Sequence, residues 1–260
     1  MLLAIDVGNT ETKLGIFEHG SDRLEHHWRV NTDARRTADE YGVFFTQLFA
    51  TASLPVGRID AVAIASVVPR LDATLADVCH KYFSVQPHFL ESHRQKLIAI
   101  RTERPAEVGA DLVAAAIGGR ARYGSPLIVV SYGTATVFTA ISSIGEYLGV
   151  AIAPGINISI DALVGRTAKL PQIALETPEH AIGRNTIESL QSGIMFGFVG
   201  QSEAITTRIR EEMNTSARVI ATGGLADVVA RNSSLIEKVD ANLSLVGLQL
   251  FYASVKDGEK

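Results

Sequence analysis

The feature that most constrains how this chain can fold is a strand–turn–strand segment that occurs at its start and again about half a chain later. Residues 2–17 consist of an apolar run, a polar turn built on Gly-Asn, and a second apolar run. Residues 127–141 follow the same order around a Gly-Thr-Ala-Thr turn. A polar glycine turn between two apolar, β-branched runs is typical of a β-hairpin. The sequence therefore predicts two related hairpins.

The repeated hairpins, together with the alternation of helix and strand patterns, predict a duplicated α/β fold. Two similar segments half a chain apart favour duplication over a chance pair of hairpins. Strand patterns alternate with amphipathic and alanine-rich helix patterns, as in mixed α/β proteins. We expect an N-terminal lobe at residues 1–118, a C-terminal lobe at residues 119–260, and an active site in the cleft between the lobes. The glycine-containing stretch 145–155 is expected to be a turn region that leads into a helix.

Composition and charge exclude several classes of function. The 260 residues carry a formal net charge of −4, so no excess of positive charge favours nucleic acid or an anionic membrane as a partner. The absence of an apolar run of about 18 residues argues against a membrane span. Cys79 is the single cysteine, which rules out an intrachain disulfide. We expect a cytoplasmic protein that acts on a small molecule.

The turn of the first hairpin carries groups that suit phosphate and metal binding. Asp6 lies at the end of the first strand and could hold Mg²⁺ or its water ligands. The amides of Gly8–Thr10 and the threonine hydroxyl could donate hydrogen bonds to phosphate oxygens. Lys13 would add a positive charge. By itself this segment fits an ordinary edge hairpin with a hydrophilic turn equally well, because short glycine motifs recur by chance.

Two further glycine-containing strand ends and one acidic helix start accompany this turn. The strand ends are Gly133–Thr136 and Ala221–Gly224. Asp111 is expected at the N-terminus of an alanine-rich helix, where the helix dipole favours the ionised carboxylate. An ionised aspartate beside a substrate hydroxyl could accept its proton during phosphoryl transfer. Taken singly, Asp111 is better interpreted as a helix N-cap, and only the flanking motifs reverse that preference.

Together these segments resemble the phosphate-1, phosphate-2 and adenosine motifs of the acetate and sugar kinase, Hsp70 and actin superfamily. A longer set of motifs, in order over nearly the whole chain, resembles one family in it, the type III pantothenate kinases. The set consists of Asp6–Thr10, Pro105–Asp111, Gly133–Thr136, Tyr147–Gly149, Ile152–Gly155, Ala168–Pro171, Ile182–Thr186 and Ala221–Gly224. The resemblance implies a duplicated two-lobe actin-like ATPase (ribonuclease H-like) fold.

The resemblance also implies a reaction, its cofactors and a partner. The implied activity is ATP-dependent phosphorylation of pantothenate to 4′-phosphopantothenate, the first step of coenzyme A biosynthesis. The implied cofactors are ATP, Mg²⁺ and a monovalent cation, K⁺ or NH₄⁺. The implied partner is a second copy of the chain, in a homodimer whose subunit interface helps to form the substrate site. The alternatives are a catalytically impaired nucleotide-binding homologue with an accessory or regulatory role, and a kinase for another hydroxyl compound.

By position, the resemblance assigns a role to each matching residue. Asp111 is the expected proton acceptor, and Asp6 is the residue expected to organise Mg²⁺. The expected nucleotide-binding residues are Asp6, Val7, Gly8, Asn9, Thr10, Lys13, Thr134 and Gly223. The expected substrate-binding residues are Gly109, Ala110, Asp111, Leu112 and Thr186, the last of them acting across the subunit interface.

Two residues depart from the pattern of the family at positions where the change affects the chemistry most. Leu112 stands where an arginine usually follows the aspartate, so a fork of donors for the substrate carboxylate is missing. Arg101 or Arg104 could supply a charge from the preceding loop. Ser131 stands where the family has an aspartate that binds a monovalent cation, and a neutral hydroxyl is a weaker ligand for a hard cation. These departures motivate the accessory alternative and predict altered cation dependence.

Overall fold

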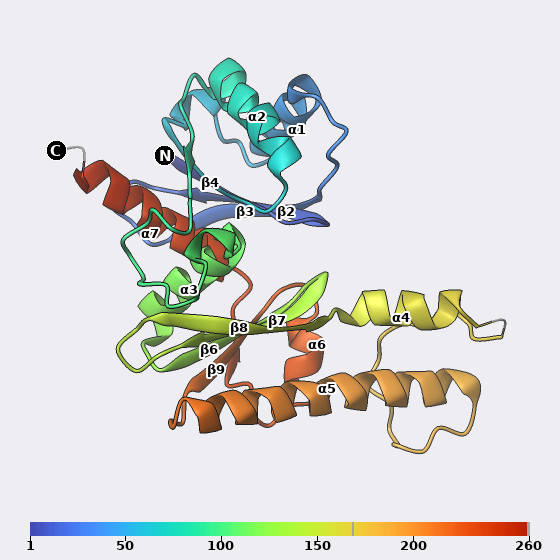
Figure 1. Ribbon diagram of the computed structural model, residues 1–260. Coiled ribbons are helices and arrows are strands. Elements are labelled where there is room, and N and C mark those ends of the chain that lie inside the picture. Colours follow the sequence, from blue (N-terminus) through green and yellow to red (C-terminus); the bar gives the residue numbers. More distant parts are fainter. Residues whose placement is uncertain (168, 259–260) are drawn as a thin grey trace. The chain divides into compact units, whose positions relative to one another are not determined.

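The computed structural model describes residues 1–167 and 169–258 and divides the chain into two compact units (Figure 1). The first unit contains residues 1–121 together with the described residues from 242 onward, and the second contains residues 122–241. Ala168, which opens one of the motifs quoted above, lies outside the described residues. Among the described residues, no helix combines the length and the apolar character that crossing a bilayer requires.

The first unit is built on a five-stranded sheet with the strand order β3-β2-β1-β4-β5. Its strands are β1 (Leu2–Val7), β2 (Glu11–Phe17), β3 (Leu24–Asn31), β4 (Ala61–Ser66) and β5 (His88–Phe89). The first three form an antiparallel meander, and β4 and β5 continue the sheet as parallel strands beside β1. β1 is therefore the central strand, and all six of its residues are buried.

Helices surround this sheet and complete the core of the first unit. They are α1 (Ala38–Thr51), α2 (Pro69–Val78), α3 (Ala110–Tyr123) and α7 (Leu243–Gly258), with the short helices η1 (Val56–Arg58), η2 (Cys79–Phe83) and η3 (Pro105–Glu107). α1 begins with a capping box in which Thr37 and Glu40 satisfy each other's backbone amides. The aromatic side chains of Tyr41, Phe45 and Phe49 then project from α1 into the buried core.

The last helix, α7, packs against the first unit through two close glycine contacts with α3. A Cβ atom at Gly247 would lie 1.8 Å from the carbonyl oxygen of Ala114, and one at Gly118 would lie 2.1 Å from that of Leu243. The helices can approach this closely only because glycine has no side chain. Residues from 242 onward thus belong to the first unit, whereas the sequence-based division assigned them to the C-terminal lobe.

The second unit repeats the plan of the first. Its sheet has the order β10-β9-β6-β7-β8, and its strands are β6 (Leu127–Tyr132), β7 (Ala135–Ile141), β8 (Tyr147–Pro154), β9 (Arg218–Thr222) and β10 (Lys238–Val239). Again three strands form an antiparallel meander and two parallel strands follow beside the first of them. The shared strand order confirms the duplicated α/β fold that the two hairpins predict.

The helices described in this unit are α4 (Ile156–Gly165), which extends away from the end of β8 in Figure 1, α5 (Thr186–Glu212) and α6 (Ala226–Ala230). The expected turn region at residues 145–155 is wrong in its main part, because residues 147–154 form strand β8. β8 is an edge strand whose outward side chains Leu148, Val150 and Ile152 are exposed. A half-buried strand is normally detected by an alternation of apolar and polar residues with a period of two. In β8 the outward side chains are apolar as well, and the glycines and Pro154 interrupt the pattern, so the alternation cannot be seen.

Candidate active site

The first hairpin places Asp6 and Lys13 opposite each other. The two residues are cross-strand partners in the β1–β2 register, and Lys13 Nζ lies 3.7 Å from Asp6 Oδ2. Directly paired side chains of an antiparallel ladder lie on the same face of the sheet. Asp6 is only 6% exposed, so this carboxylate is held next to a positive charge near the end of a buried strand.

The turn between these strands is fixed by backbone contacts. The Gly8 amide donates to the Glu11 carbonyl oxygen at 3.0 Å, and a Cβ atom at Gly8 would lie 2.9 Å from that same oxygen. From β3's end, the Thr32 hydroxyl donates to the Gly8 carbonyl oxygen at 2.8 Å. The predicted phosphate-binding residues Asn9 and Thr10 are exposed at the tip of this ordered turn.

Asp111 lies in the first turn of α3, where its Oδ1 accepts the Leu112 amide proton at 2.8 Å. Burial and the negative charge of Asp6 raise the pKa of Asp111 to about 6, against the lowering effects of the Leu112 amide and of Lys13. Asp6 and Lys13 thus both act on the carboxyl group of Asp111, and the three side chains form one electrostatic group. A carboxyl group with such a pKa is mostly ionised at neutral pH and is suited to accept a proton.

Gly109 leaves room for this carboxylate. A Cβ atom at Gly109 would lie 2.6 Å from Asp111 Oδ1, so a larger residue would displace the acidic side chain. The neighbouring Ala110 is buried at the start of α3. The Gly-Ala-Asp sequence thus has a local steric reason in addition to its chemistry.

Sequence analysis missed Ser244, a buried residue in the first turn of α7. Its hydroxyl donates to Asp6 Oδ2 at 2.5 Å, and its exposure is 5%. The two residues are separated by 238 positions in the chain. No local pattern marks a single serine in an apolar helix, so the contact could not be found without the fold.

At Leu112 itself, no positive charge replaces the arginine that the family has for the substrate carboxylate. Leu112 is half-buried and directly follows Asp111. Arg104, one of the two arginines considered as a substitute, is exposed and is paired with Glu107 at 3.0 Å. Arg101, the other, is also exposed.

In the second unit, the β6–β7 turn is built like the first hairpin. The Gly133 amide donates to the Ala135 carbonyl oxygen at 3.0 Å, and Thr134 is exposed at the tip. Ser131 lies two residues before this glycine, as Asp6 lies two residues before Gly8. Ser131 therefore occupies, in the second hairpin, the position of the acidic residue in the first.

The glycine turn after β9 lies beside the same end of β6. Ser131 and Thr222 are partners in the parallel β6–β9 register. Gly223 has a φ of +96°, and a Cβ atom there would lie 2.5 Å from the Tyr132 carbonyl oxygen. Only glycine satisfies both constraints without strain. The predicted adenosine residue Gly223 and the turn that carries Thr134 therefore lie at the same edge of the second sheet.

Thr186 is the first residue of α5 and is exposed. Asn185 caps the helix by accepting the Glu188 amide proton at 3.0 Å. The side chain of Thr186 is thus not used by its own helix cap.

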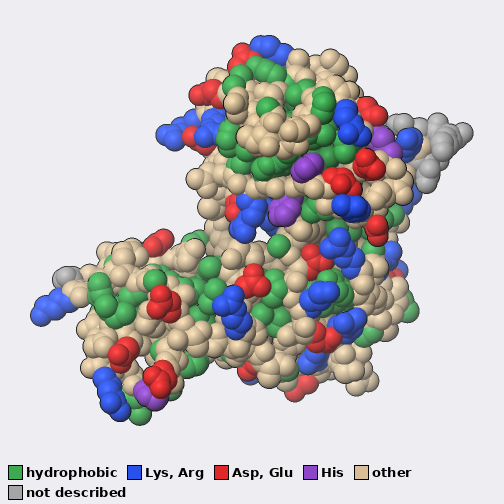
Figure 2. All heavy atoms as spheres, turned by 180° about the vertical axis from the view of Figure 1, so that it is seen from behind, with side chains coloured by type: hydrophobic (Ala, Val, Ile, Leu, Met, Phe, Trp, Pro, Cys, Tyr) green, Lys and Arg blue, Asp and Glu red, His purple; other side chains and the backbone are tan. Residues whose placement is uncertain are grey.

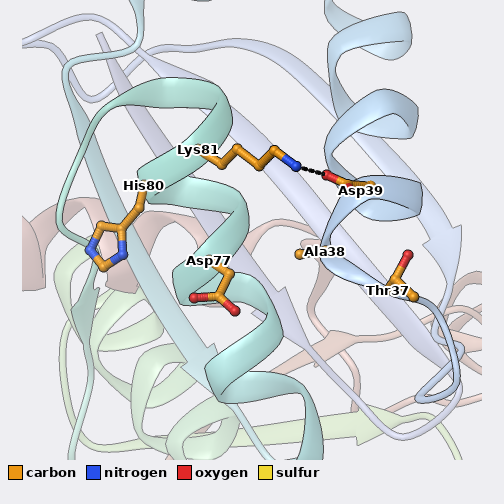
Figure 3. Close-up of a pocket in the computed structure, with 6 residues that line it drawn as sticks. All are labelled: Thr37, Ala38, Asp39, Asp77, His80 and Lys81. Carbon is orange, nitrogen blue, oxygen red and sulfur yellow. Dashed lines mark hydrogen bonds and ion pairs between the residues drawn. The ribbon is translucent and has the colours of Figure 1, made fainter.

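A surface hollow of about 540 Å³ lies elsewhere in the first unit, between the start of α1 and the end of α2 with η2 (Figure 3). It is lined by Thr37, Ala38, Asp39, Asp77, His80 and Lys81. Figure 3 shows Lys81 reaching across to Asp39, and the two groups are 2.6 Å apart. None of the predicted site residues lines this hollow, so it is not the candidate active site.

Comparison with known proteins identifies the family. The family model for type III pantothenate kinase matches residues 2–208. A type III pantothenate kinase of Myxococcus xanthus (strain DK1622) is 45% identical over 252 residues, which cover 97% of this chain and 98% of the relative. One from Brevibacillus brevis is 46% identical with the same coverage.

Solved structures of distant proteins share the fold. The activator of 2-hydroxyisocaproyl-CoA dehydratase from Clostridium difficile, with bound ADPNP, has a TM-score of 0.60 at 12% identity, over 99% of this chain and 96% of that one. A Sinorhizobium meliloti protein described as a 2-dehydro-3-deoxygalactonokinase has a TM-score of 0.58 at 14% identity, over 98% and 96%. These likenesses agree with the actin-like ATPase and sugar kinase fold. The match of the family model and the high identity over almost the whole chain show that this chain belongs to the type III pantothenate kinase family.

Proposed function

We propose that this chain is an active kinase that transfers the γ-phosphoryl group of ATP to the hydroxyl group of pantothenate, giving 4′-phosphopantothenate and ADP. Membership in the family supports the reaction. The single observation that supports catalysis by this chain is the group of Asp111, Asp6 and Lys13, in which Asp111 has a pKa of about 6. The chain thus has a carboxylate for the base (Asp111), a second carboxylate for the metal ligand (Asp6) and a positive charge for the phosphate contact (Lys13).

Asp111 is the proton acceptor in this proposal. Its carboxylate orients the substrate hydroxyl and takes its proton while the hydroxyl oxygen bonds to the γ-phosphorus. The bond from the γ-phosphorus to the bridging oxygen breaks, and ADP leaves with those electrons. The proton on Asp111 passes to solvent before the next turnover. Because the pKa of Asp111 is about 6, the group is mostly ready to accept a proton at neutral pH.

Asp6 has the chemistry that Mg²⁺ requires. A carboxylate oxygen is a preferred ligand of this hard cation, and Mg²⁺ usually takes only one or two carboxylates, with water and substrate phosphates completing its shell. The described residues contain no cluster of three or more His, Cys, Asp or Glu side chains that could hold a metal. A single buried carboxylate with fixed orientation therefore fits Mg²⁺ bound together with ATP. Bound there, the ion would neutralise charge on the phosphates.

The nucleotide contacts follow from the turns of each unit. In the first unit, Gly8–Thr10 would donate to phosphate oxygens and Lys13 would supply a charge. In the second unit, Thr134 would contact phosphate and the glycine turn at Gly223 would contact adenosine. Ser131 offers only a neutral hydroxyl at the monovalent-cation position, so we propose that turnover does not depend on K⁺ or NH₄⁺.

A homodimer is the proposed assembly, with Thr186 contacting substrate bound to the other copy. The support lies in the second unit, where large apolar side chains are exposed on β8, α4 and the start of α5. Figure 2 shows apolar side chains reaching the surface over the part of the second unit that carries α4 and α5. Ile152 of β8 is 68% exposed and Ile187, in the first turn of α5, is 51% exposed. A row of exposed apolar side chains, such as Leu148, Val150 and Ile152 on one face of β8, marks interaction sites more often than isolated exposed residues do.

One observation favours the accessory alternative. Leu112 provides no donor for the substrate carboxylate, and Arg104 is paired with Glu107 instead. A chain that binds ATP but holds pantothenate poorly would act as a nucleotide-binding partner rather than as an enzyme.

The direct test is ADP release in the presence of ATP, Mg²⁺ and pantothenate, with the product identified by mass spectrometry. We expect turnover that is lost in Asp111→Asn. Tight ATP binding without turnover would support the accessory role. Turnover only with another alcohol, in a panel of hydroxy acids and sugars, would reassign the substrate.

A further inference from the structure

We propose that Ser244 is a positioning residue that fixes the carboxylate of Asp6 in the orientation needed to bind Mg²⁺ with ATP. The inference deepens the proposed function and rests on the role of Asp6 given there. Ser244 Oγ donates to Asp6 Oδ2 at 2.5 Å, and the two residues are 5% and 6% exposed. A short hydrogen bond to an ionised group inside a protein is among the stronger polar contacts.

The geometry at Asp6 explains why this bond would control orientation. Lys13 Nζ is 3.7 Å from the same oxygen, Oδ2. Two positive or donating groups therefore act on one oxygen of the carboxylate from β2 and α7. This arrangement disfavours rotation of the carboxylate about its terminal torsion, which is otherwise broad for aspartate.

The position of Ser244 in the helix is itself fixed by its neighbours. Leu243 precedes it, and the Leu243 carbonyl oxygen is in close contact with Gly118 of α3. Leu245 follows it and packs against Gly15 of β2, where a Cβ atom would lie 3.0 Å from Leu245 Cδ1. The hydroxyl is thus held between the helix that carries Asp111 and the strand that carries Lys13. These contacts join the elements that carry the proposed metal ligand Asp6, the phosphate contact Lys13 and the base Asp111.

The test uses two variants and a matched control in the full chain. Ser244→Ala removes the donor, and Ser244→Thr keeps it. Ser202→Ala removes another buried serine hydroxyl, 3% exposed in the second unit, which accepts from Tyr132 and donates to the Phe198 carbonyl oxygen. This control measures the general effect of losing a buried hydroxyl.

The main readout is Mg²⁺ binding in the presence of a non-hydrolysable ATP analogue, measured by calorimetry without turnover. We expect Ser244→Ala to weaken Mg²⁺ binding about tenfold, as loss of a hydrogen bond to a charged group implies. The Mg²⁺ concentration for half-maximal rate should rise by a similar factor. The KM for pantothenate should change by less than about twofold, because only the metal contact is affected. Ser244→Thr should stay near the wild type, and Ser202→Ala should leave Mg²⁺ binding unchanged.

Wild-type Mg²⁺ binding in Ser244→Ala would overturn the inference, and so would equal weakening in the alanine and threonine variants. If Ser244→Ala does not fold, Ser244→Cys replaces it, because the thiol keeps the volume but is a weak donor. Binding of Mg²⁺ with the analogue by a wild-type chain that never phosphorylates pantothenate would refute the proposed function alone. Calorimetry on the variants would still decide the role of Ser244.

Discussion

At the scale of the residue, the environment that raises the pKa of Asp111 also lowers the stability of the folded protein at neutral pH. Burial and the charge of Asp6 raise its pKa from 3.8 to about 6 in the folded protein. The folded state therefore binds this proton more tightly than the unfolded chain does. The resulting stability is fully present below the unfolded pKa and is lost as pH rises through about 6. At neutral pH the ionised, partly buried carboxylate is a source of instability in the folded protein.

Asp111→Asn should separate these two effects. We expect loss of turnover by at least about a hundredfold, since no other group takes the proton. The unfolding free energy at pH 7.5 should rise by about 1–3 kcal/mol, because the unfavourable buried charge is gone. Asparagine retains an acceptor for the Leu112 amide, so the helix start is preserved. Urea denaturation at several pH values checks this, and the difference from wild type should vanish below about pH 4. Retained activity would mean that Asp111 only accepts the Leu112 amide proton in the first turn of α3.

The same pKa predicts the pH dependence of the reaction. With saturating ATP and Mg²⁺, kcat/KM for pantothenate should fall below about pH 6 with unit slope, because protonated Asp111 cannot accept a proton. A pH–rate profile in constant ionic strength measures this limb. An acid limb near the ordinary pKa of an aspartate would show that the base is a different or less buried group.

In the proposed reaction, Leu112 leaves the substrate carboxylate without the forked donor that an arginine would supply at this position. Leu112→Arg would place a guanidinium beside the first turn of α3, and we expect the KM for pantothenate to fall about tenfold from a new charge-assisted contact. Leu112→Met, of similar volume and without charge, is the control and should leave the KM unchanged. An unaltered KM in the arginine variant would indicate that another cation already meets the carboxylate.

At the scale of the element, the two hairpins share the same antiparallel arrangement, but one carries an acidic residue where the other carries a neutral one. Ser131 takes the position in the second hairpin that Asp6 takes in the first. We expect kcat to be the same within about twofold in K⁺, NH₄⁺ and choline salts, since a lone hydroxyl binds a hard cation weakly. Ser131→Asp should introduce a requirement for K⁺ or NH₄⁺. Strong activation of the wild type by K⁺ would show that backbone oxygens suffice for the site.

An element can be predicted from the sequence when the residues that indicate it lie close together in the chain. Both hairpins are predicted correctly because a glycine turn between β-branched runs lies within 16 or so residues. Strand β8 is missed because its outward side chains are apolar like its inward ones, so the alternation disappears. The Ser244–Asp6 bond and the packing of α7 on the first unit join residues from opposite ends of the chain. Only the folded chain shows such contacts.

At the scale of the whole molecule, the exposed apolar surface of the second unit predicts how copies of the chain associate. Leu148, Val150 and Ile152 lie on one face of the edge strand β8 and are 38%, 40% and 68% exposed. Leaving such a face in water is unfavourable, and burial between two copies would relieve it. Light scattering at micromolar concentration should therefore give the mass of a dimer.

Ile152→Asp should shift this equilibrium towards monomers, because a carboxylate would have to lose its hydration to enter an apolar interface. Val43→Asp is the matched control: Val43 is 56% exposed on α1 in the first unit, and its variant should remain dimeric. If Thr186 of the partner subunit contacts the substrate, the monomeric variant should also lose pantothenate affinity while keeping its affinity for ATP. A wild type that stays monomeric, or an Ile152→Asp variant that stays dimeric with normal KM, would exclude this face as the interface and leave Thr186 without its proposed role.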